Sequence, residues 1–366
     1  MFLRDWRFWI GAAVSVLFLG ILVYQVDFGE IKQSLRQANY LYVIPAVTVY
    51  FIAVYFRAVR WRYLLSPIAS FRVRRLYPVV VIGYMANNLL PARLGELVRS
   101  YYLSQRENCP ASTALATVMV ERVYDGLTLL LFAVVAAPVL LMLGRFQGYG
   151  NLSGGAASVL AAGVVAIFVA ALLVLTLLAK TSADGALAGW FLRLAPTAGA
   201  RDKVRDLVHA FIEGLGILNS PGKHLVLLLF SIPIWLLESS MYLLVGYSFG
   251  LDGLFPSIWV FVLAALLLTA TSNLVTSLPT AMGGIGPFEL VAQQTLVALG
   301  AGASVAGAYA GFLHIVALWL PVNLVGLALL FAQNISLKQL TSAPKVSGSE
   351  AVLSTSTELS GPSEGL

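Results

Sequence analysis

The sequence predicts an all-α polytopic membrane protein, and composition and the length of its apolar runs lead to that class. The chain has 366 residues, of which 59% are hydrophobic and only 11% are charged, and its mean hydropathy is +0.86. Soluble domains carry about 25% charged residues. Several apolar runs approach the length of about 20 residues that a membrane-spanning helix needs. We expect about seven to eight transmembrane helices together with two broken or re-entrant helical hairpins.

Two interrupted stretches organise the rest of the chain. The first ends an apolar run and contains Asn87, Asn88, Pro91, Arg93, Gly95, Glu96 and Arg99. The second contains Asn273, Pro279, Gly283, Gly284, Gly286 and Glu289. Polar groups and freed backbone are costly in hydrocarbon unless they find partners or line a cavity. We therefore expect the two stretches to face one another and to line a polar path through the membrane.

The N-terminal part of the chain sets the expected topology. Residues 8–24 follow two arginines and are interpreted as an uncleaved first span with a cytoplasmic N-terminus. Residues 27–39 are expected to be a short external loop, and residues 40–56 a second span. A cytoplasmic loop should then carry Arg57, Arg60, Arg62, Arg72, Arg74 and Arg75. These cations either orient the protein and contact headgroups, or recognise a substrate specifically.

Charged residues recur within the apolar segments that follow. Residues 76–103 should form two short helices that enter and leave on one side, because Pro91 and Gly95 break the pattern. Residues 111–143 then carry Glu121, Arg122 and Asp125. These charges lie either among headgroups at an interfacial helix start, or inside the bundle paired with Arg93, Arg99 or Glu96.

The second half should contain four more apolar segments and a polar tail. Spans are expected at residues 156–179, 224–249, 256–277 and 301–331, with a cytoplasmic amphipathic section at about 180–223. Glu238 falls in the middle of one span, so it should face the bundle interior and be neutral or paired. It then serves either transport or a structural hydrogen bond. We divide the chain into an integral membrane domain, 1–340, and a disordered tail, 341–366.

Composition argues against several site types. The chain has one cysteine and three histidines that lie far apart in sequence, so we expect no metal and no cofactor. The net charge of +6 resides in membrane-flanking loops, so it indicates topology and anionic lipid rather than nucleic acid. No catalytic constellation is visible, and the sequence favours a non-enzymatic role.

The two breaks have a chemistry that suits a phosphate or a zwitterionic headgroup. Each break frees backbone groups, and the helix that follows it offers a positive N-terminus. Arg93 and Arg99 add guanidinium groups that match phosphate geometry. In the alternative interpretation, the glycines only permit close helix packing and the charges only neutralise one another.

Three ordered motifs carry a family resemblance. They are Asn88-Leu89-Leu90-Pro91-Ala92-Arg93-Leu94-Gly95-Glu96, then Glu121-Arg122-Val123-Tyr124-Asp125, then Leu278-Pro279 with Gly283-Gly284-Ile285-Gly286-Pro287-Phe288-Glu289. Together they resemble the membrane region of lysylphosphatidylglycerol synthases, over about residues 6–331. The resemblance implies a flippase-like protein of a bacterial or archaeal cytoplasmic membrane. The soluble synthase domain would have to follow residue 331, where we expect only the tail, so synthase activity is not implied.

The leading hypothesis is a translocator of phospholipids or lipid-linked headgroups. In it, Arg93 and Arg99 hold phosphate, while Glu96, Glu238 and Glu289 balance charge or hold an ammonium group. The alternatives are a membrane enzyme acting on a lipid-linked sugar or amino acid, and an accessory scaffold for the synthesis of a modified lipid. Expected partners are membrane lipids with anionic or zwitterionic headgroups. A lipid-modifying enzyme or a second copy of the chain could join them.

Overall fold

The computed structural model describes residues 6–90, 94–107, 109–146, 221–276 and 283–333, and a few isolated positions between 162 and 205. Every regular element in these ranges is a helix. The α-helices are α1 (Trp6–Tyr24), α2 (Phe28–Gln37), α3 (Val43–Leu65), α4 (Val73–Leu89), α5 (Gly95–Arg106), α6 (Ala111–Met142), α10 (Pro221–Ser248), α11 (Ile258–Val275), α12 (Pro287–Ala298), α13 (Ala303–Phe312) and α14 (Leu320–Ala332). A π-helical segment, Leu313–Trp319, joins α13 to α14, and short 3-10 helices occupy Tyr40–Tyr42 and Leu251–Leu254.

The all-helical membrane class is confirmed by the helices that the structure describes. Five of them are long and apolar enough to cross a membrane: Tyr40–Leu65, Ala111–Met142, Gly222–Ser248, Ile258–Val275 and Ala303–Ala332. The first helix and α2, bent by 86° at their junction, make a sixth span if they are counted as one. The expected span 156–179, most of the amphipathic section and the tail 341–366 lie outside the described residues. The total of seven to eight spans therefore stays a prediction.

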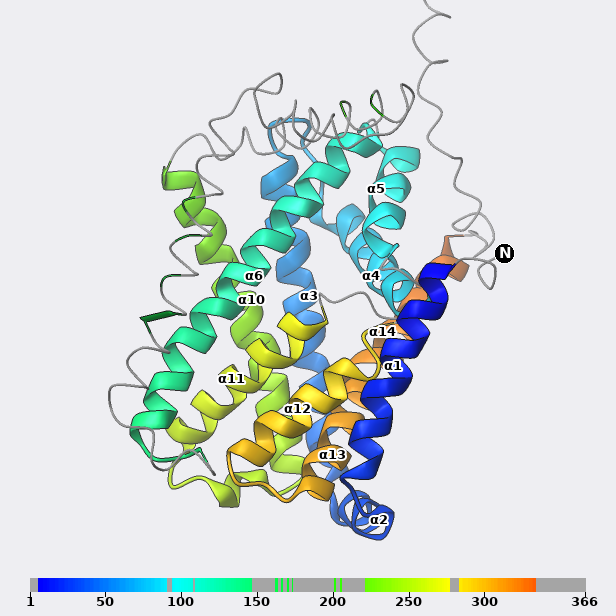
Figure 1. The fold of residues 1–366 in the computed structure, drawn as a ribbon. Helices are drawn as coiled ribbons and strands as arrows, with labels where there is room; N and C mark the ends of the chain where they lie inside the picture. Colours follow the sequence, from blue (N-terminus) through cyan, green and yellow to red (C-terminus); the bar gives the residue numbers. More distant parts are fainter. Residues whose placement is uncertain are drawn as a thin grey trace, which may run out of the picture.

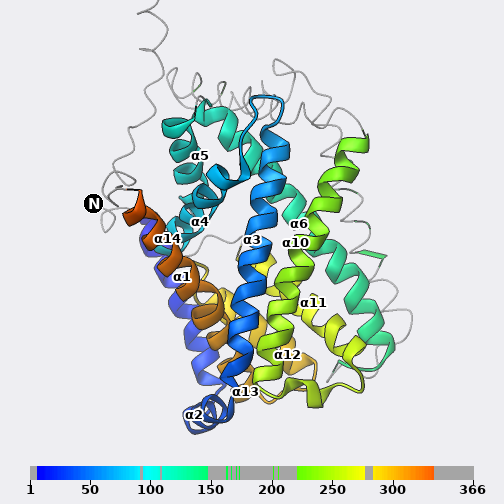
Figure 2. The same cartoon turned by 180° about the vertical axis from the view of Figure 1, so that it is seen from behind.

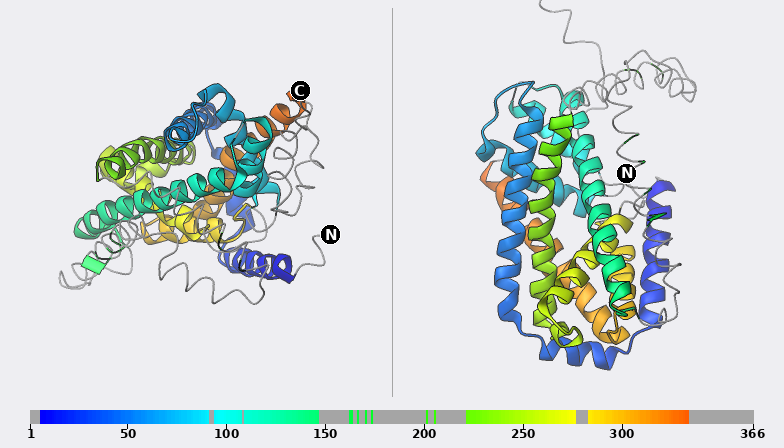
Figure 3. Two further views of the ribbon diagram at one scale, coloured as in Figure 1. Left: turned by 90° about the horizontal axis from the view of Figure 1, so that it is seen from above. Right: turned by 90° about the vertical axis from the view of Figure 1, so that its left-hand side faces the viewer.

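Long helices surround two shorter helical hairpins. Helices α3, α6 and α10 lie side by side over most of the height of the molecule (Figures 1, 2 and 3). Helices α4 and α5 form a hairpin in the upper half in Figure 1, and α11 and α12 form one in the lower half. The open ends of the hairpins point in opposite directions, so their tips approach one another at mid-height (Figure 1).

Two glycines bring the helices of the upper hairpin close together. A Cβ atom on Gly95 would collide with the carbonyl oxygen of Gly83 on α4. The Gly95 N–H, at the start of α5, donates to Oδ1 of Asn87 at 2.7 Å. Asn87 therefore satisfies a helix-terminal donor that would otherwise be unpaired in an apolar setting.

Glycine conformation and a carboxylate cap shape the tip of the lower hairpin. Gly283, Gly284 and Gly286 have φ values of 56°, 82° and 100°, in the region that side-chain-bearing residues rarely adopt. Helix α12 begins directly afterwards with Pro287, a residue favoured at a first helical position. The Glu289 carboxylate accepts from the Gly286 N–H at 2.7 Å, which completes the helix start.

Residues 27–39 are not the loop that the charges suggested. They form α2, whose N-cap Asp27 accepts from the Glu30 N–H at 3.0 Å. Ile31 and Leu35 follow at helical spacing, so a cap and an apolar stripe were both present in the sequence. The prediction failed because the mixed charges were taken as evidence for a loop, although they occupy the polar face of an amphipathic helix.

The second span is longer than expected, and this changes the status of two arginines. Helix α3 continues past residue 56 to Leu65. Arg57 and Arg60 were placed in a cytoplasmic loop, but they lie on this helix and are 5% and 0% exposed. Interpreting them as loop cations was wrong. The positive-inside rule uses only the number of charges near a span, and it contains no information on where the helix ends.

Candidate functional site

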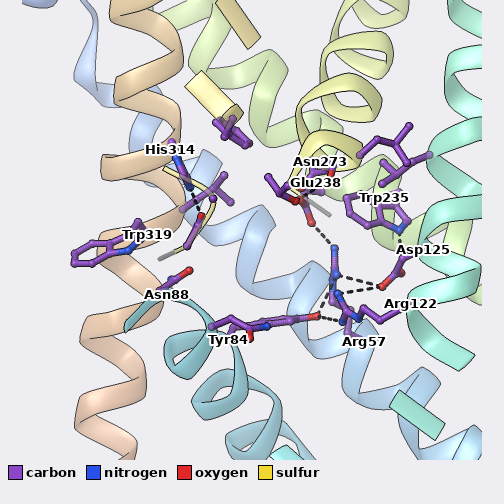
Figure 4. Close-up of a pocket in the computed structure, with 18 of the residues that line it drawn as sticks. Arg57, Tyr84, Asn88, Arg122, Asp125, Trp235, Glu238, Asn273, His314 and Trp319 are labelled. Atoms are coloured by element: carbon purple, nitrogen blue, oxygen red, sulfur yellow. Dashed lines mark hydrogen bonds and ion pairs between the residues drawn. The ribbon is translucent and has the colours of Figure 1, made fainter. Parts of the chain in front are cut away.

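A polar cavity of about 430 Å³ lies where the two hairpins meet the long helices (Figure 4). Both broken stretches contribute to its wall. Its polar lining includes Tyr50, Arg57, Tyr84, Asn87, Asn88, Glu96, Arg122, Asp125, Trp235, Glu238, Asn273, Thr276, Gly283, Gly284, His314 and Trp319. A space of this size is within the usual range for a small-molecule or headgroup site.

The tips of the two hairpins are in direct contact. The Gly283 N–H donates to the carbonyl oxygen of Asn87 at 3.2 Å. Asn88 donates from Nδ2 to Oδ1 of Asn323 on α14 at 3.5 Å. The expectation that the interrupted stretches face one another is therefore confirmed for the residues that the structure describes.

One wall of the cavity is built around Arg57 of α3. Its guanidinium forms an ion pair with Glu238 of α10 and donates to the hydroxyl of Tyr84 at 3.1 Å. The same group stacks over the Trp235 ring, 4.6 Å from its centre. Glu238 thus faces the interior and is paired, as its position in the sequence predicted.

Arg60 holds the centre of the charge network one helical turn further along α3. It donates to Oδ1 of Asp125 at 2.8 Å and to the Ser231 hydroxyl at 2.7 Å, and it lies 3.6 Å from Glu121. Trp235 Nε1 also donates to Asp125 at 3.0 Å. With two carboxylates and a hydroxyl around it, this fully buried guanidinium is compensated.

Arg99 of α5 belongs to the same network but lies behind the cavity wall. It forms an ion pair with Glu121 at 2.6 Å, and its guanidinium carbon lies 3.7 Å from the centre of the Trp61 ring. Pairing of the α6 acids with Arg99 was one of two open alternatives. It is the correct one, because Glu121 and Asp125 are 0% and 4% exposed and cannot sit among headgroups.

Arg122 and Glu96 are the more accessible charges at the cavity. The Arg122 side chain is 28% exposed, lies 3.6 Å from Asp125 and donates to the Tyr84 hydroxyl at 3.5 Å. Glu96, at the start of α5, accepts from Asn87 Nδ2 at 3.1 Å. A guanidinium and a carboxylate that each retain room for another partner therefore line the same space.

The network contains four guanidiniums, of Arg57, Arg60, Arg99 and Arg122, and three carboxylates, of Glu121, Asp125 and Glu238. Buried charges must be compensated, and this cluster retains one unit of positive charge. Glu96 supplies the opposite charge at the first hairpin. With Glu96 included, four guanidiniums are matched by four carboxylates, so the charges in and behind the cavity wall sum to zero.

A second buried pair, Glu289 of α12 and His314 of the π-helical segment, lies beside the cavity. His314 Nδ1 lies 2.6 Å from Glu289 Oε1, and Nε2 lies 3.1 Å from the carbonyl oxygen of Gly283. Only His314 of the two lines the cavity. In Figure 4 it lies across the cavity from the Arg57–Asp125 cluster.

The predicted site residues divide into three groups. Those that line the cavity are Asn87, Asn88, Glu96, Arg122, Asp125, Glu238, Asn273, Gly283 and Gly284. Those that pack behind its wall are Gly95, Arg99, Glu121, Gly286 and Glu289. Pro91, Arg93 and Pro279 lie outside the described residues.

Sequence reasoning missed several cavity residues, chief among them Arg57, Tyr84, Trp235 and His314. For Arg57 a signal existed: the apolar residues Ala58, Trp61 and Leu64 continue the helical spacing of α3 beyond it. For the aromatic residues no such signal existed, since an aromatic residue in an apolar run cannot be distinguished by sequence from an ordinary core residue. Among the described residues, no cluster of three or more His, Cys, Asp or Glu is arranged to hold a metal ion.

These features define a multi-pass helical membrane protein with a charged internal cavity between two opposed hairpins. The chain belongs to the family described as the lysylphosphatidylglycerol synthase TM region, whose model matches residues 8–325. The match confirms the resemblance seen in the three motifs.

Curated relatives come from archaea. A UPF0104 membrane protein of Methanothermobacter thermautotrophicus is 26% identical over 340 residues, covering 89% of this chain and 96% of that protein. The glycosyltransferase AglD of Haloferax volcanii is 26% identical over 312 residues, which cover 79% of this chain but only 48% of AglD. A UPF0104 membrane protein of Methanocaldococcus jannaschii is 30% identical over 122 residues, 32% of this chain and 36% of that protein. No solved structure matches the chain.

Proposed function

We propose that the protein translocates a phosphate-bearing lipid headgroup, of a phospholipid or a lipid-linked group, between membrane leaflets. The observation that carries this proposal is the polar cavity formed where the tips of two oppositely directed hairpins meet. Paired interrupted segments in the two halves of a chain are a recurrent design of transporter binding sites. The headgroup occupies the cavity while its acyl chains remain in the bilayer.

The residues proposed to hold the headgroup differ from those that the sequence suggested. Arg99 is committed to Glu121 and Trp61, so it is not available to a ligand. The cavity guanidiniums of Arg57 and Arg122, with the Tyr84 hydroxyl between them, replace it as phosphate donors. Glu96 is the carboxylate that receives an ammonium or hydroxyl group. Arg93, which lies between α4 and α5 in the sequence, remains a proposed contributor.

The proposal includes a topology and a location. Each hairpin is re-entrant, entering and leaving on one side, and the complete chain has seven to eight spans with a cytoplasmic N-terminus. Irregular backbone at mid-membrane survives where it lines a cavity, as residues at both tips do here. The protein acts in the cytoplasmic membrane of an archaeon or bacterium, and its partners are anionic or zwitterionic lipids.

Leaflet exchange in reconstituted vesicles tests the function. Purified protein is incorporated into vesicles with labelled phosphatidylglycerol, and accessibility of the label to an external quencher is followed over time. We expect wild-type protein to accelerate exchange and Arg122→Gln to slow it about tenfold, the effect of losing about 1.4 kcal/mol from a charged contact. Arg74→Gln, an exposed arginine of α4 outside the cavity, is the matched control. Exchange no faster than in protein-free vesicles would refute the proposal.

A second candidate is a membrane enzyme, or a scaffold, for the synthesis of a modified lipid such as a lipid-linked sugar. The similarity to a relative named as a glycosyltransferase favours it, although this chain spans about half of that protein. Product formation by purified protein given a nucleotide sugar and a lipid phosphate would support the enzyme. A neighbouring synthase recovered by cross-linking, with full activity after Arg122→Gln, would support the scaffold.

A further inference from the structure

The geometry points to a proton-binding site at the Glu289–His314 pair, through which we propose that lipid movement is coupled to a proton gradient. Both ring nitrogens of His314 face acceptors: Nδ1 faces the Glu289 carboxylate at 2.6 Å, and Nε2 faces the Gly283 carbonyl at 3.1 Å. A carbonyl oxygen and an ionised carboxylate can only accept. Both contacts are satisfied together when one proton lies between Nδ1 and the carboxylate and a second proton is on Nε2.

The environment of Glu289 favours this protonation state. Its second oxygen, Oε2, accepts from the Gly286 N–H at the first turn of α12, where a negative charge is stabilised by the helix N-terminus. The Phe288 ring stacks on the His314 ring at 4.2 Å between centres, which fixes the ring and favours a cation. Loss of the shared proton leaves a neutral ring, whose Nδ1 lone pair then faces a carboxylate oxygen at hydrogen-bonding distance.

The titratable groups that share the cavity with His314 are Tyr50 and Arg57 of α3, Tyr84 of α4, Glu96 of α5, Arg122 and Asp125 of α6, and Glu238 of α10. Tyr242 of α10 lies against Phe288, and the Tyr309 hydroxyl of α13 donates to the Tyr242 carbonyl oxygen. Arg57 and Glu238 form an ion pair with one another. The described side chains of α11 and α14 carry no charge, and neither do those of α1. The pair with one shared proton is neutral, and after releasing that proton it has a charge of −1.

The position of the pair connects this proton to both hairpin tips. His314 lines the cavity, so a proton can exchange with water or a headgroup there. It contacts the carbonyl of Gly283, whose own N–H donates to Asn87 of the first hairpin. The ring sits in a π-helical segment, a rare conformation that is frequent at functional sites. Release of the proton removes the Glu289–His314 hydrogen bond, which positions the ring that contacts Gly283, and so loosens the junction between the tips.

Nitrogen-15 NMR of histidine-labelled protein in lipid vesicles tests the proton site directly. We expect the His314 ring to give the doubly protonated signal at pH 7.5, and Glu289→Gln to abolish that signal. His224→Gln, a histidine outside the cavity, is the matched control and should leave it unchanged. A neutral His314 ring in the wild type at pH 7.5, or a protonated one that persists in Glu289→Gln, would overturn the assignment.

The coupling rests on the proposed translocation, and vesicles with an imposed pH difference separate the two. With the membrane potential held at zero, one proton per lipid predicts a steady-state leaflet ratio of about ten for one pH unit. Glu289→Gln should remove this ratio, and His224→Gln should keep it. Wild-type exchange that ignores the gradient overturns the coupling and leaves the translocator intact. Absence of any exchange refutes the translocator, while the NMR result still decides the proton site.

Discussion

At the scale of single residues, substitutions of Arg57 and Glu238 should have strongly non-additive effects on stability, because the two side chains form a buried ion pair. Both side chains are about 5% exposed, and the described residues place no second cation within ion-pair distance of Glu238. Arg57→Met leaves an uncompensated buried carboxylate, which costs about 3–5 kcal/mol of stability. The double variant with Glu238→Met removes both charges and should recover most of that loss. Chemical unfolding in detergent micelles measures the free energy of unfolding of the wild type, the two single variants and the double variant, which together form a double-mutant cycle.

An exposed ion pair provides the control for this cycle. The Arg75 side chain, 62% exposed, lies 3.0 Å from Glu107, and Arg75→Met should cost about 1 kcal/mol or less. A double variant as unstable as Arg57→Met alone would show that the Arg57–Glu238 pair is not the source of the destabilisation.

Some residues of the candidate site could be predicted from the sequence and others could not. Asn87, Asn88, Glu96 and Gly283 could be predicted as a site, because amides, acids and paired glycines are rare in apolar runs and signal a break. Arg57 could not be separated by composition from the arginines that follow it in the sequence, because membrane orientation and ligand binding use the same side chain. Its partner Glu238 is 181 positions away, and a local sequence pattern gives no information on contacts at that separation.

At the scale of elements, the upper hairpin depends on close approach of α4 and α5. A Cβ on Gly95 would strike the Gly83 carbonyl and would lie 2.5 Å from Asn87 Oδ1. Gly95→Ala should therefore separate the helices, displace the Asn87 cap and destabilise the protein by about 1–3 kcal/mol. Thermal unfolding in detergent, together with lipid exchange, measures both consequences.

A helical glycine with free space around it gives the comparison. No heavy atom lies within 4 Å of a Cβ built on Gly311 of α13, so Gly311→Ala should be neutral or stabilising by about 0.5–1 kcal/mol. If Gly95→Ala behaved in the same way, the close contact between α4 and α5 would not be needed for the hairpin.

Element types were easier to predict than element ends. The breaks at both hairpins followed from proline and glycine, and α6 coincides with the segment 111–143 that was delimited by its mostly apolar residues. The end of α3 and the existence of α2 did not follow, because charged residues on one face of a helix resemble a loop when only their number is considered. Helical periodicity through the charged residues was the better guide.

At the scale of the whole molecule, translocation requires the hairpin tips to move relative to the surrounding helices. Asn88 of the first hairpin contacts Asn323 of α14 at 3.5 Å, so cysteines at both positions can be joined by a short, reducible cross-linker. We expect cross-linking of Asn88→Cys/Asn323→Cys in a Cys109→Ala background to stop lipid exchange, and reduction to restore it. A cavity open alternately to the two sides cannot operate when this junction is fixed.

A second cross-link separates movement of the tips from general stiffening. Tyr124 and His224 join the long helices α6 and α10 at 2.6 Å, away from the cavity. Cross-linked Tyr124→Cys/His224→Cys should exchange lipid at the rate of its reduced form, because in the proposed mechanism the hairpins move and these long helices do not. Full exchange with Asn88 cross-linked to Asn323 would mean that headgroups pass through a static cavity, and that movement of the first hairpin against α14 does not gate them.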